Sequence, residues 1–252
     1  MKQIRAGTPQ GSPLSPILFS LLINRIGKIL DKHGIQYALF ADDLTIWKIH
    51  SRLNHIQKTL QNATSAIIKF FTKISLKINE KKCLYSIFTN KRTESRMNIL
   101  VNNQPIDYTH NPVILGIIFD KKLNFTDHFL NLARNITSKI NILKLLSHKS
   151  NRLNIKTLMT IFKAFILSKI QYSMIPFQHT TKKNRNELQI LQNKCLKIIL
   201  GLPTRTSTSF IHSTLKLDML ETRINKLCSN YLTKAKLSNE SIKETITRSK
   251  SL

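Results

Sequence analysis

Two adjacent carboxylates, Asp42 and Asp43, interrupt an apolar segment that has the composition of β-strands. Aromatic and β-branched residues surround them at 36–40 (QYALF) and 44–47 (LTIW), which predicts a hairpin with the acids at or beside its tip. Acids are depleted in strands, and a two-residue turn prefers Gly or Asn, so local structure does not explain Asp-Asp. Paired carboxylates on a rigid ribbon suit Mg²⁺. A solvated hairpin tip without a ligand is the alternative.

A turn-rich segment at residues 7–16 (GTPQGSPLSP) precedes a run of apolar residues at helical spacing. Pro13 or Pro16 suits the first helical turn, where a missing N–H costs nothing. The pattern predicts a loop that enters a buried helix. Gly11 would let the backbone approach a nucleotide closely, and the amide of Gln10 would hydrogen-bond a base or sugar.

In this order and spacing, the two segments resemble the palm of reverse transcriptases. Residues 10–16 (QGSPLSP) look like the family's template-and-nucleotide loop, and residues 40–43 (FADD) like its aromatic-Ala-Asp-Asp hairpin. Residues 78–83 (INEKKC) resemble the next palm motif, Asn-x-x-Lys. Residues 115–125 (LGIIFDKKLNF), with His128 beyond, resemble the Leu-Gly-x-x-x-Asp segment of non-LTR retrotransposons, especially jockey-like LINE elements. This last match argues against group II intron maturases.

The resemblance covers residues 4–237 and implies an RNA-directed DNA polymerase that uses two Mg²⁺ ions, an RNA template, an RNA–DNA hybrid and dNTPs. Asp42 would be the main metal ligand and Asp43 the supporting acid. Lys82 would face the incoming triphosphate, although an exposed lysine on a basic surface is an equal alternative. The implied nucleotide- and template-binding residues are Gln10, Gly11, Ser12 and Phe40, with Phe40 packed beneath the site.

The chain departs from the family at its start. These enzymes need another metal-binding aspartate on a strand upstream of the Gln-Gly-Ser-Pro loop, and residues 1–6 contain no acid. The resemblance therefore implies a palm–thumb fragment with an incomplete two-ion site. We expect the isolated chain to be inactive, and the upstream half of the polymerase to be a partner.

Three features of the downstream segment are interpreted structurally. Gly116 should permit a tight strand or bulge, and Asp120 should end a strand and cap the helix after it. His128 is expected to be structural rather than catalytic. The aromatic residues of the following helices are expected in the core: Phe162, Phe165, Tyr172 and Phe177.

Charge points to a polyanionic partner. The formal net charge is +27 and the isoelectric point is about 10.3, and residues 128–186 contain no Asp or Glu. A basic surface of this kind predicts salt-sensitive contacts with a nucleic-acid backbone. Candidates for these contacts are Arg134, Lys139 and Lys144. Part of the lysine excess also fits an AT-rich coding sequence.

These patterns predict an α+β fold with a partial polymerase palm (antiparallel strands with packed helices) at 1–125, an all-helical thumb and C-terminal region at 126–237 and a loose tail at 238–252. Three scattered cysteines form neither a disulfide framework nor a zinc motif, which favours a reducing, intracellular location, nuclear or cytoplasmic. No apolar stretch predicts a membrane span.

Three functions remain open at this point. The chain is part of a non-LTR reverse transcriptase that acts when joined to its upstream half, a non-catalytic basic nucleic-acid-binding remnant of a retroelement, or a relic that does neither.

Overall fold

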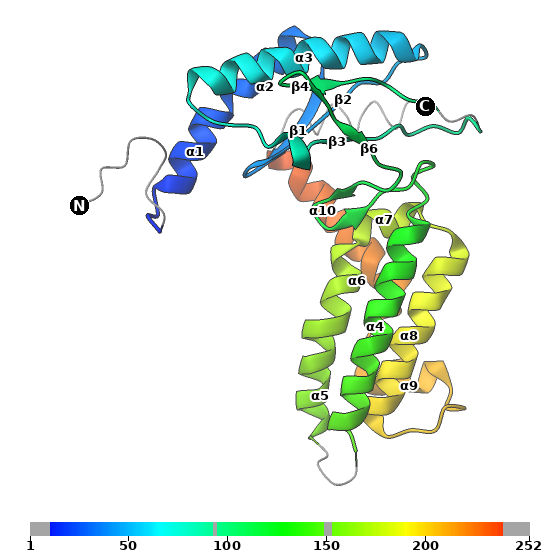
Figure 1. Ribbon diagram of the computed structural model, residues 1–252. Helices are drawn as coiled ribbons and strands as arrows, with labels where there is room; N and C mark the ends of the chain where they lie inside the picture. Colours follow the sequence, from blue (N-terminus) through cyan, green and yellow to red (C-terminus); the bar gives the residue numbers. More distant parts are fainter. Residues whose placement is uncertain (1–10, 93–94, 149–152, 239–252) are drawn as a thin grey trace. The chain divides into compact units, whose positions relative to one another are not determined.

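The computed structural model describes residues 11–92, 95–148 and 153–238. Its contacts divide the chain into two compact units: unit 1 comprises residues 1–87 and 91–110, and unit 2 comprises residues 88–90 and 111–252. The division falls earlier than the boundary expected at 125. Both units combine helices with short two-stranded sheets, so the α+β class is confirmed (Figure 1). The assignment of the units to a palm and a thumb stays a prediction.

Unit 1 packs helices and small sheets around one core. Its elements are α1 (Ser15–Ile23), α2 (Arg25–Lys32), β1 (Gln36–Phe40), β2 (Asp43–Trp47), α3 (Leu53–Lys73), the 3₁₀ turn η1 (Glu80–Lys82), β3 (Leu84–Tyr85), β4 (Leu100–Val101), β5 (Gln104–Pro105) and β6 (Asp107–Tyr108). Helix α2 contacts both α3 and β1. The buried core comprises Ile23, Ile26, Leu30, Ile35, Leu60, Ala63, Ile67, Met97 and Ile99.

The first helix is exposed, so the prediction that it would be buried is wrong. Four apolar residues at the start of α1 and within it are 52–64% exposed: Leu14, Ile17, Leu18 and Leu21. The apolar residues of α1 lie nearly all around it, and its contact within unit 1 is with α2. Because one neighbouring helix covers only one stripe, the other faces of α1 stay open to solvent.

The strand β4 is held by a side chain of α3. The Gln61 amide donates to the Leu100 carbonyl (3.0 Å) and accepts from the Leu100 N–H (2.7 Å). The side chain thus satisfies both backbone groups of Leu100, as a neighbouring strand would. β4 then turns into β5 through Asn102 and Asn103, with φ of 49° and 63°. Asn tolerates this left-handed region, which permits the two-residue turn.

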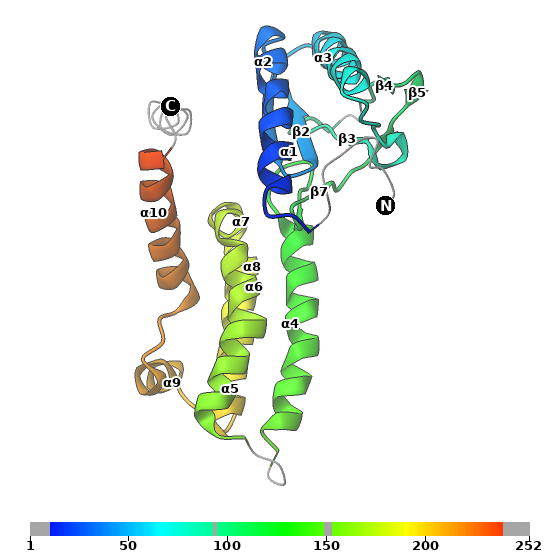
Figure 2. The same cartoon turned by 90° about the vertical axis from the view of Figure 1, so that its left-hand side faces the viewer.

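Unit 2 is mainly helical. Its elements are β7 (Val113–Ile114), β8 (Ile117–Ile118), α4 (Thr126–Leu146), α5 (Ile155–Phe162), the π-helical turn η2 (Lys163–Leu167), α6 (Ser168–Tyr172), α7 (Met174–His179), α8 (Lys182–Leu200), α9 (Thr208–Leu215) and α10 (Leu220–Ser238). Helices α4, α5 and α8 lie side by side in both ribbon views (Figures 1 and 2). No helix in the described ranges is long and apolar enough to span a bilayer.

Asp120 organises the chain between β8 and α4. Its carboxylate accepts hydrogen bonds from the backbone N–H groups of Lys122 (3.1 Å), Asn124 (2.9 Å) and Thr126 (3.0 Å). Thr126 is the first residue of α4, where N–H groups have no partner within the helix. The predicted capping role of Asp120 is therefore confirmed.

His128 has a structural role, as expected. It is buried, its Nδ1 accepts from the Ile118 N–H (3.4 Å), and its Nε2 lies 2.8 Å from Ser173 Oγ. Because Nδ1 is an acceptor, the ring is neutral and Nε2–H donates to the hydroxyl. Burial lowers the pKa of His128 below its usual value, which favours this neutral form.

Candidate metal centre and nucleic-acid interface

The predicted hairpin is present and places both acids at its tip. β1 and β2 pair antiparallel from Gln36 opposite Trp47 to Phe40 opposite Asp43. This register leaves Ala41 and Asp42 as a two-residue turn. Asp42 therefore lies in the turn itself, and Asp43 is the first residue of the returning strand.

The turn is strained by its sequence. Ala41 has φ of 50°, a left-handed conformation in which its Cβ crowds the backbone. This costs roughly 1–2 kcal/mol, and glycine would avoid the cost. Strained turns of this kind concentrate at functional sites, where the surrounding structure holds them in place.

Close packing against α2 fixes the base of the hairpin. A Cβ at Gly27 would collide with Tyr37 Oη and lie 3.1 Å from Tyr37 Cζ, so glycine leaves room for the Tyr37 ring to lie against the helix. On the hairpin, Leu39, Leu44 and Ile46 pack against the core of unit 1. Packing therefore holds the ribbon up to the Leu39–Leu44 pair, next to the tip.

The carboxylates of Asp42 and Asp43 are free to accept a ligand. Both residues are exposed, and neither side chain hydrogen-bonds or pairs with any residue that the structure describes. Mg²⁺ is held in many nucleotide sites by one or two carboxylates plus substrate phosphates, which fits this pair. Across residues 11–92, 95–148 and 153–238, no group of three or more His, Cys, Asp or Glu side chains forms a metal-ligand cluster.

Phe40 does not pack beneath the tip, and that expectation is wrong. Its side chain is 64% exposed. The alternation of side chains along β1 explains the difference: the preceding residue, Leu39, packs against the core, so Phe40 lies on the opposite face of the hairpin. An aromatic ring beside the acids is thus available to a ligand instead.

The loop before α1 is partly described. Gly11 has φ of 85°, and a Cβ there would meet nothing within 4 Å, so the position is open and favours glycine by conformation alone. Ser12 Oγ accepts from the Leu14 N–H (3.3 Å), and Pro16 lies in the first turn of α1 as predicted. Gln10 lies outside the described residues, so its predicted role with template or nucleotide stays a prediction.

Lys82 ends the 3₁₀ turn η1 with an exposed side chain. No hydrogen bond or ion pair of the described residues joins Lys82 to Asp42 or Asp43. Its neighbour Glu80 accepts from Asn102 Nδ2 (2.5 Å), and this bond lowers the pKa of Glu80. Both earlier interpretations of Lys82 therefore stay open.

Residues 2–119 match the family of reverse transcriptases (RNA-dependent DNA polymerases). The chain is similar to the RNA-directed DNA polymerase from mobile element jockey of Drosophila melanogaster, with 27% identity over 237 residues that cover 92% of this chain and 26% of the relative. The chain is similar to reverse transcriptases of non-LTR retrotransposons over part of their length. The matched residues contain the Asp42–Asp43 tip.

Two further polymerases of mobile elements are similar to the chain over nearly the same length. The jockey polymerase of Drosophila funebris is 25% identical over 237 residues, again covering 92% of this chain and 26% of the relative. The probable RNA-directed DNA polymerase from transposon BS of Drosophila melanogaster is 24% identical over 234 residues, covering 90% and 26% respectively. The reverse-transcriptase-like chain thus spans about a quarter of the length of these curated relatives. No solved structure matches it significantly.

The predicted backbone-binding residues of this chain do not share one face of α4. Arg134, Lys139 and Lys144 are spaced five residues apart, and five residues turn an α-helix by about 140°. Arg134 and Lys144 are exposed, while Lys139 is half-buried beside Phe165, with its Nζ 5.8 Å from the ring centroid. The basic residues are therefore distributed around α4, and Lys139 belongs to the side that faces η2.

Two aromatic residues predicted for the core are exposed instead. Phe162 and Phe177 are buried as expected, but Phe165 is 58% and Tyr172 62% exposed. Tyr172 Oη donates to the Leu115 carbonyl (2.6 Å) in the β7–β8 turn. This turn comprises Leu115 and Gly116, both at positive φ, so Gly116 serves a two-residue turn rather than a bulge.

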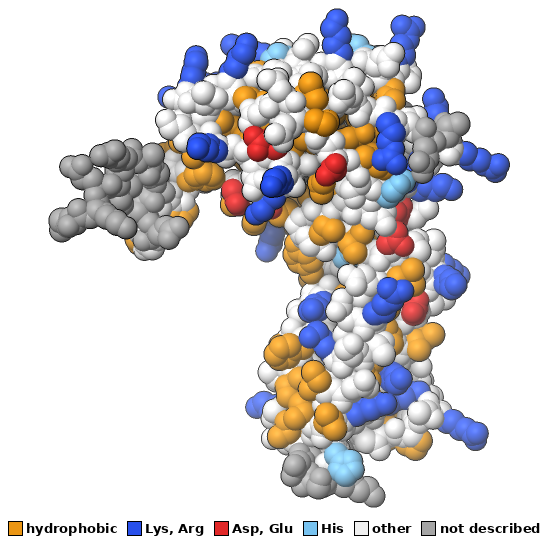
Figure 3. All heavy atoms as spheres, in the orientation of Figure 1, with side chains coloured by type: hydrophobic (Ala, Val, Ile, Leu, Met, Phe, Trp, Pro, Cys, Tyr) orange, Lys and Arg blue, Asp and Glu red, His pale blue; other side chains and the backbone are white. Residues whose placement is uncertain are grey.

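Exposed aromatic rings in the helical region are features that the sequence interpretation missed. The π-helical turn η2 inserts a residue into the helix that contains Phe165, which shifts the helical period on which the burial prediction depended. On the face drawn in Figure 3, apolar side chains gather over α5, and lysine and arginine side chains lie around them.

Proposed function

We propose that this chain forms part of an RNA-directed DNA polymerase of a non-LTR retrotransposon, and that it contributes the carboxylates of Asp42 and Asp43 to the metal centre. The observation that carries the proposal is the hairpin with two unpaired acids at its tip, inside the segment that matches reverse transcriptases. The ligands are an RNA template, its hybrid with the growing DNA strand, and dNTPs.

Asp42 and Asp43 would hold Mg²⁺ together with the phosphates of the nucleotide. When bound, divalent ions supply charge stabilisation for the attacking and leaving oxygens of nucleotidyl transfer. Phe40, which is exposed beside the acids, would contact the sugar or base of the nucleotide. Gly11 has no side chain, so the backbone of its loop could approach the nucleotide closely. Lys82 would neutralise the leaving pyrophosphate.

A further carboxylate completes the site in this proposal, and we place it on a segment outside these 252 residues. Two observations support this: the described residues hold no third ligand near the tip, and the curated relatives are about four times longer. The exposed apolar faces of α1 would pack against that segment. The 252-residue polypeptide alone is then expected to extend no primer.

The test is Mg²⁺-dependent primer extension on an RNA template by the full-length polymerase that contains this chain. Asp42→Asn should reduce extension by at least about 100-fold, as expected when preorganised charge at a reacting centre is removed. Asp31→Asn is the matched control, because Asp31 is an exposed acid on α2. Equal activity of the two variants would refute the assignment of Asp42.

A second candidate function is nucleic-acid binding without catalysis. The charge of +27 and the absence of acids from residues 128–186 favour it. This function predicts that the 252-residue polypeptide binds RNA–DNA hybrids with a steep salt dependence. Asp42→Asn distinguishes the two functions, because it should reduce primer extension but leave hybrid binding unchanged.

A further inference from the structure

A row of polar side chains joins α8 to the segment between α9 and α10. Gln189 and Asn193 lie one turn apart on α8, and His212 lies on α9. Gln189 Oε1 accepts a hydrogen bond from the backbone N–H of Leu220 (2.8 Å), the first residue of α10. At the other end of the row, His212 Nδ1 lies 2.7 Å from the backbone carbonyl of Leu217. We call Gln189, Asn193 and His212 the α8–α9 network.

The two backbone groups fix the direction of every hydrogen bond in this network. A backbone N–H only donates, so the oxygen of the Gln189 amide must face Leu220. Gln189 Nε2 then donates to Asn193 Oδ1 (2.8 Å). His212 Nε2 lies 2.9 Å from the same oxygen, so it must donate as well. His212 Nδ1 must donate to the Leu217 carbonyl, because a carbonyl only accepts.

A histidine that donates from both ring nitrogens is in its charged form. The neutral ring of His212 would carry one hydrogen, and this hydrogen would stay on Nδ1 because Leu217 offers only an acceptor. Nε2 would then present a lone pair to Asn193 Oδ1, acceptor against acceptor. Loss of one proton from the ring therefore breaks the bond to Asn193 unless Asn193 reverses its amide.

The charged groups around the ring suit its charged form. The hydrogen bond from Lys226 (2.9 Å) lowers the pKa of the Asp218 carboxyl, and the positive charges of Lys226, Arg223 and His212 act in the same direction. An anionic neighbour of this kind favours a charged imidazole. Helix α9 itself contains no Lys, Arg, Asp or Glu. On the surrounding elements, the other charged residues nearest in sequence to the network are Glu187, Lys194 and Lys197 on α8, Lys216 after α9, and Glu221 on α10, which pairs with Arg185.

The amides of the network can reverse only together. A reversed Asn193 would present its Nδ2 to both His212 and Gln189, so Gln189 would have to turn its oxygen toward Asn193. The Gln189 nitrogen would then face the Leu220 N–H, donor against donor. Leu220 is 1% exposed, and the N–H of the first residue of a helix has no acceptor within the helix. Reversal therefore removes the acceptor that holds the start of α10.

A fourth amide gains from the same reversal. Gln192 is fully buried, its Oε1 accepts from Gln189 Nε2 (2.8 Å), and its Nε2 has no hydrogen-bond partner among the described residues. If Gln189 turns its oxygen toward Gln192, the Gln192 nitrogen can donate to that oxygen. The arrangement with charged His212 thus satisfies Leu220 and leaves Gln192 Nε2 unpaired, and the reversed arrangement does the opposite. The network has two discrete states, and one proton selects between them.

We propose that the α8–α9 network is a proton switch that holds or releases the start of α10. While His212 is charged, Gln189 accepts from the Leu220 N–H. When the half-buried His212 ring gives its Nε2 proton to solvent, the amides reverse together and Leu220 loses its acceptor. The start of α10 is therefore held at low pH and released as the pH rises through the range in which histidine changes charge. This is the sign for a group whose charged form is satisfied in the folded state. The inference does not depend on the polymerase assignment.

The experiment follows the ring and the amide in the same samples of the 252-residue chain. NMR spectra of ¹⁵N-labelled histidine count the ring hydrogens of His212, and amide exchange, corrected for its intrinsic pH dependence, measures protection at Leu220. The pH is raised from about 5 until His212 has lost a ring hydrogen. Leu220 should lose at least about tenfold protection over that same interval.

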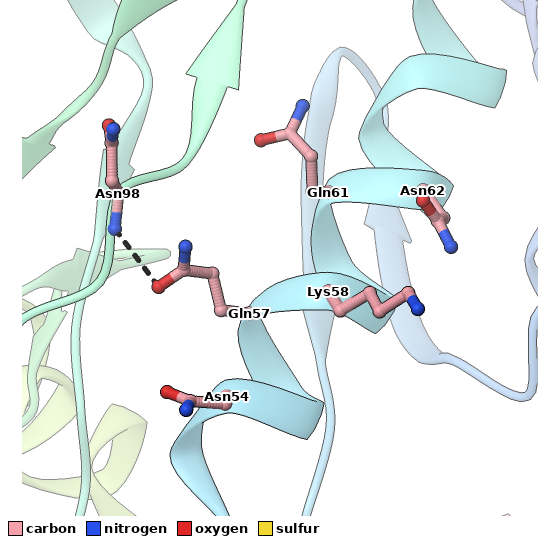
Figure 4. Close-up of a pocket in the computed structure, with 6 residues that line it drawn as sticks. All are labelled: Asn54, Gln57, Lys58, Gln61, Asn62 and Asn98. Atoms are coloured by element: carbon pink, nitrogen blue, oxygen red, sulfur yellow. Dashed lines mark hydrogen bonds between the residues drawn. The ribbon is translucent and has the colours of Figure 1, made fainter.

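Leu100 provides the matched control amide. Its N–H is also held by a glutamine oxygen, Gln61 Oε1 at 2.7 Å, and Figure 4 draws Gln61 extending from α3. No histidine hydrogen-bonds to Gln61 among the residues that the structure describes. Protection at Leu100 should therefore not change in the interval in which His212 titrates.

A charge-matched pair of variants completes the test. Asn193→Asp cannot reverse, because both carboxylate oxygens are acceptors, so Leu220 should stay protected over the pH interval of the wild type. Asn186→Asp adds the same charge at an exposed position of α8 and should keep the loss of protection. Far-UV circular dichroism checks that each variant is folded.

Three results would overturn the proposal. Protection at Leu220 stays constant in the wild type while His212 loses a ring hydrogen, Leu100 loses protection in parallel with Leu220, or Asn193→Asp behaves like Asn186→Asp. The first two results come from the wild type, so the proposal is decided even if a variant does not fold.

Discussion

Replacement of Asp120 by Ala should release the chain between β8 and α4. The carboxylate accepts three backbone hydrogen bonds, and each bond to an ionised group contributes about 1.5–3 kcal/mol when shielded from water. Asp120 is only half-buried, and loss of a helix cap alone costs about 0.5–2 kcal/mol. We therefore expect a local loss of about 2–4 kcal/mol for Asp120→Ala. Asp120→Asn keeps one acceptor oxygen and should lose about half as much.

Amide hydrogen exchange measures this effect at the donors themselves. A loss of 2–4 kcal/mol corresponds to exchange that is faster by about 30- to 700-fold at Lys122, Asn124 and Thr126. Asp127→Asn is the control, because Asp127 lies in the first turn of α4 but accepts from the Asn111 side chain rather than from these amides. Unchanged exchange at all three amides in Asp120→Ala would refute the capping argument.

Three further substitutions test the packing around the site. Gly27→Ala should destabilise unit 1 because its Cβ collides with Tyr37, yet in a Tyr37→Ala background it should stabilise by about 1 kcal/mol through helix propensity, as measured by urea unfolding. Ala41→Gly should stabilise the hairpin by about 0.5–1 kcal/mol, because relief of the left-handed strain outweighs the extra conformational entropy of glycine in the unfolded chain. An unchanged free energy of unfolding would contradict this. Burial in the folded state lowers the pKa of His128. The folded state is therefore stabilised by neutral His128 above the unfolded pKa of about 6.5, and this stabilisation is lost as the pH falls through the folded pKa. Urea unfolding at a series of pH values should show this slope in the wild type, and a His128→Gln variant with the same slope would contradict the assignment.

Local patterns were sufficient to predict the hairpin and the Asp120 cap. The two strands around Asp42 and Asp43 have the composition of strands on both sides, and their short separation permits one register. Asp120 lies between a strand pattern and a helical pattern, and its carboxylate reaches the N–H of Thr126, six residues on, because the chain between them turns back toward it. The end of α8 also follows a local rule: Gly201 has φ of 68°, and the next N–H, of Leu202, donates back to the Lys197 carbonyl (2.9 Å).

Burial was harder to predict, because apolar composition does not say what covers a residue. Helix α1 and Phe40 are apolar but lie outside the core of unit 1. Phe165 follows the start of a π-helical turn that no local sequence signal marks, so its exposure could not be read from a regular helical period.

Paramagnetic relaxation by Mn²⁺ tests the central claim most directly, because it detects a weak metal site without requiring catalysis. The 252-residue chain, labelled with ¹⁵N, is titrated with Mn²⁺ in the presence of a dNTP, and the amide signals are followed by NMR. We predict selective broadening of residues 41–44, and loss of that broadening in Asp42→Asn but not in Asp31→Asn. Broadening that spares the hairpin tip, or that persists unchanged in Asp42→Asn, would contradict the assignment of Asp42 and Asp43 as metal ligands.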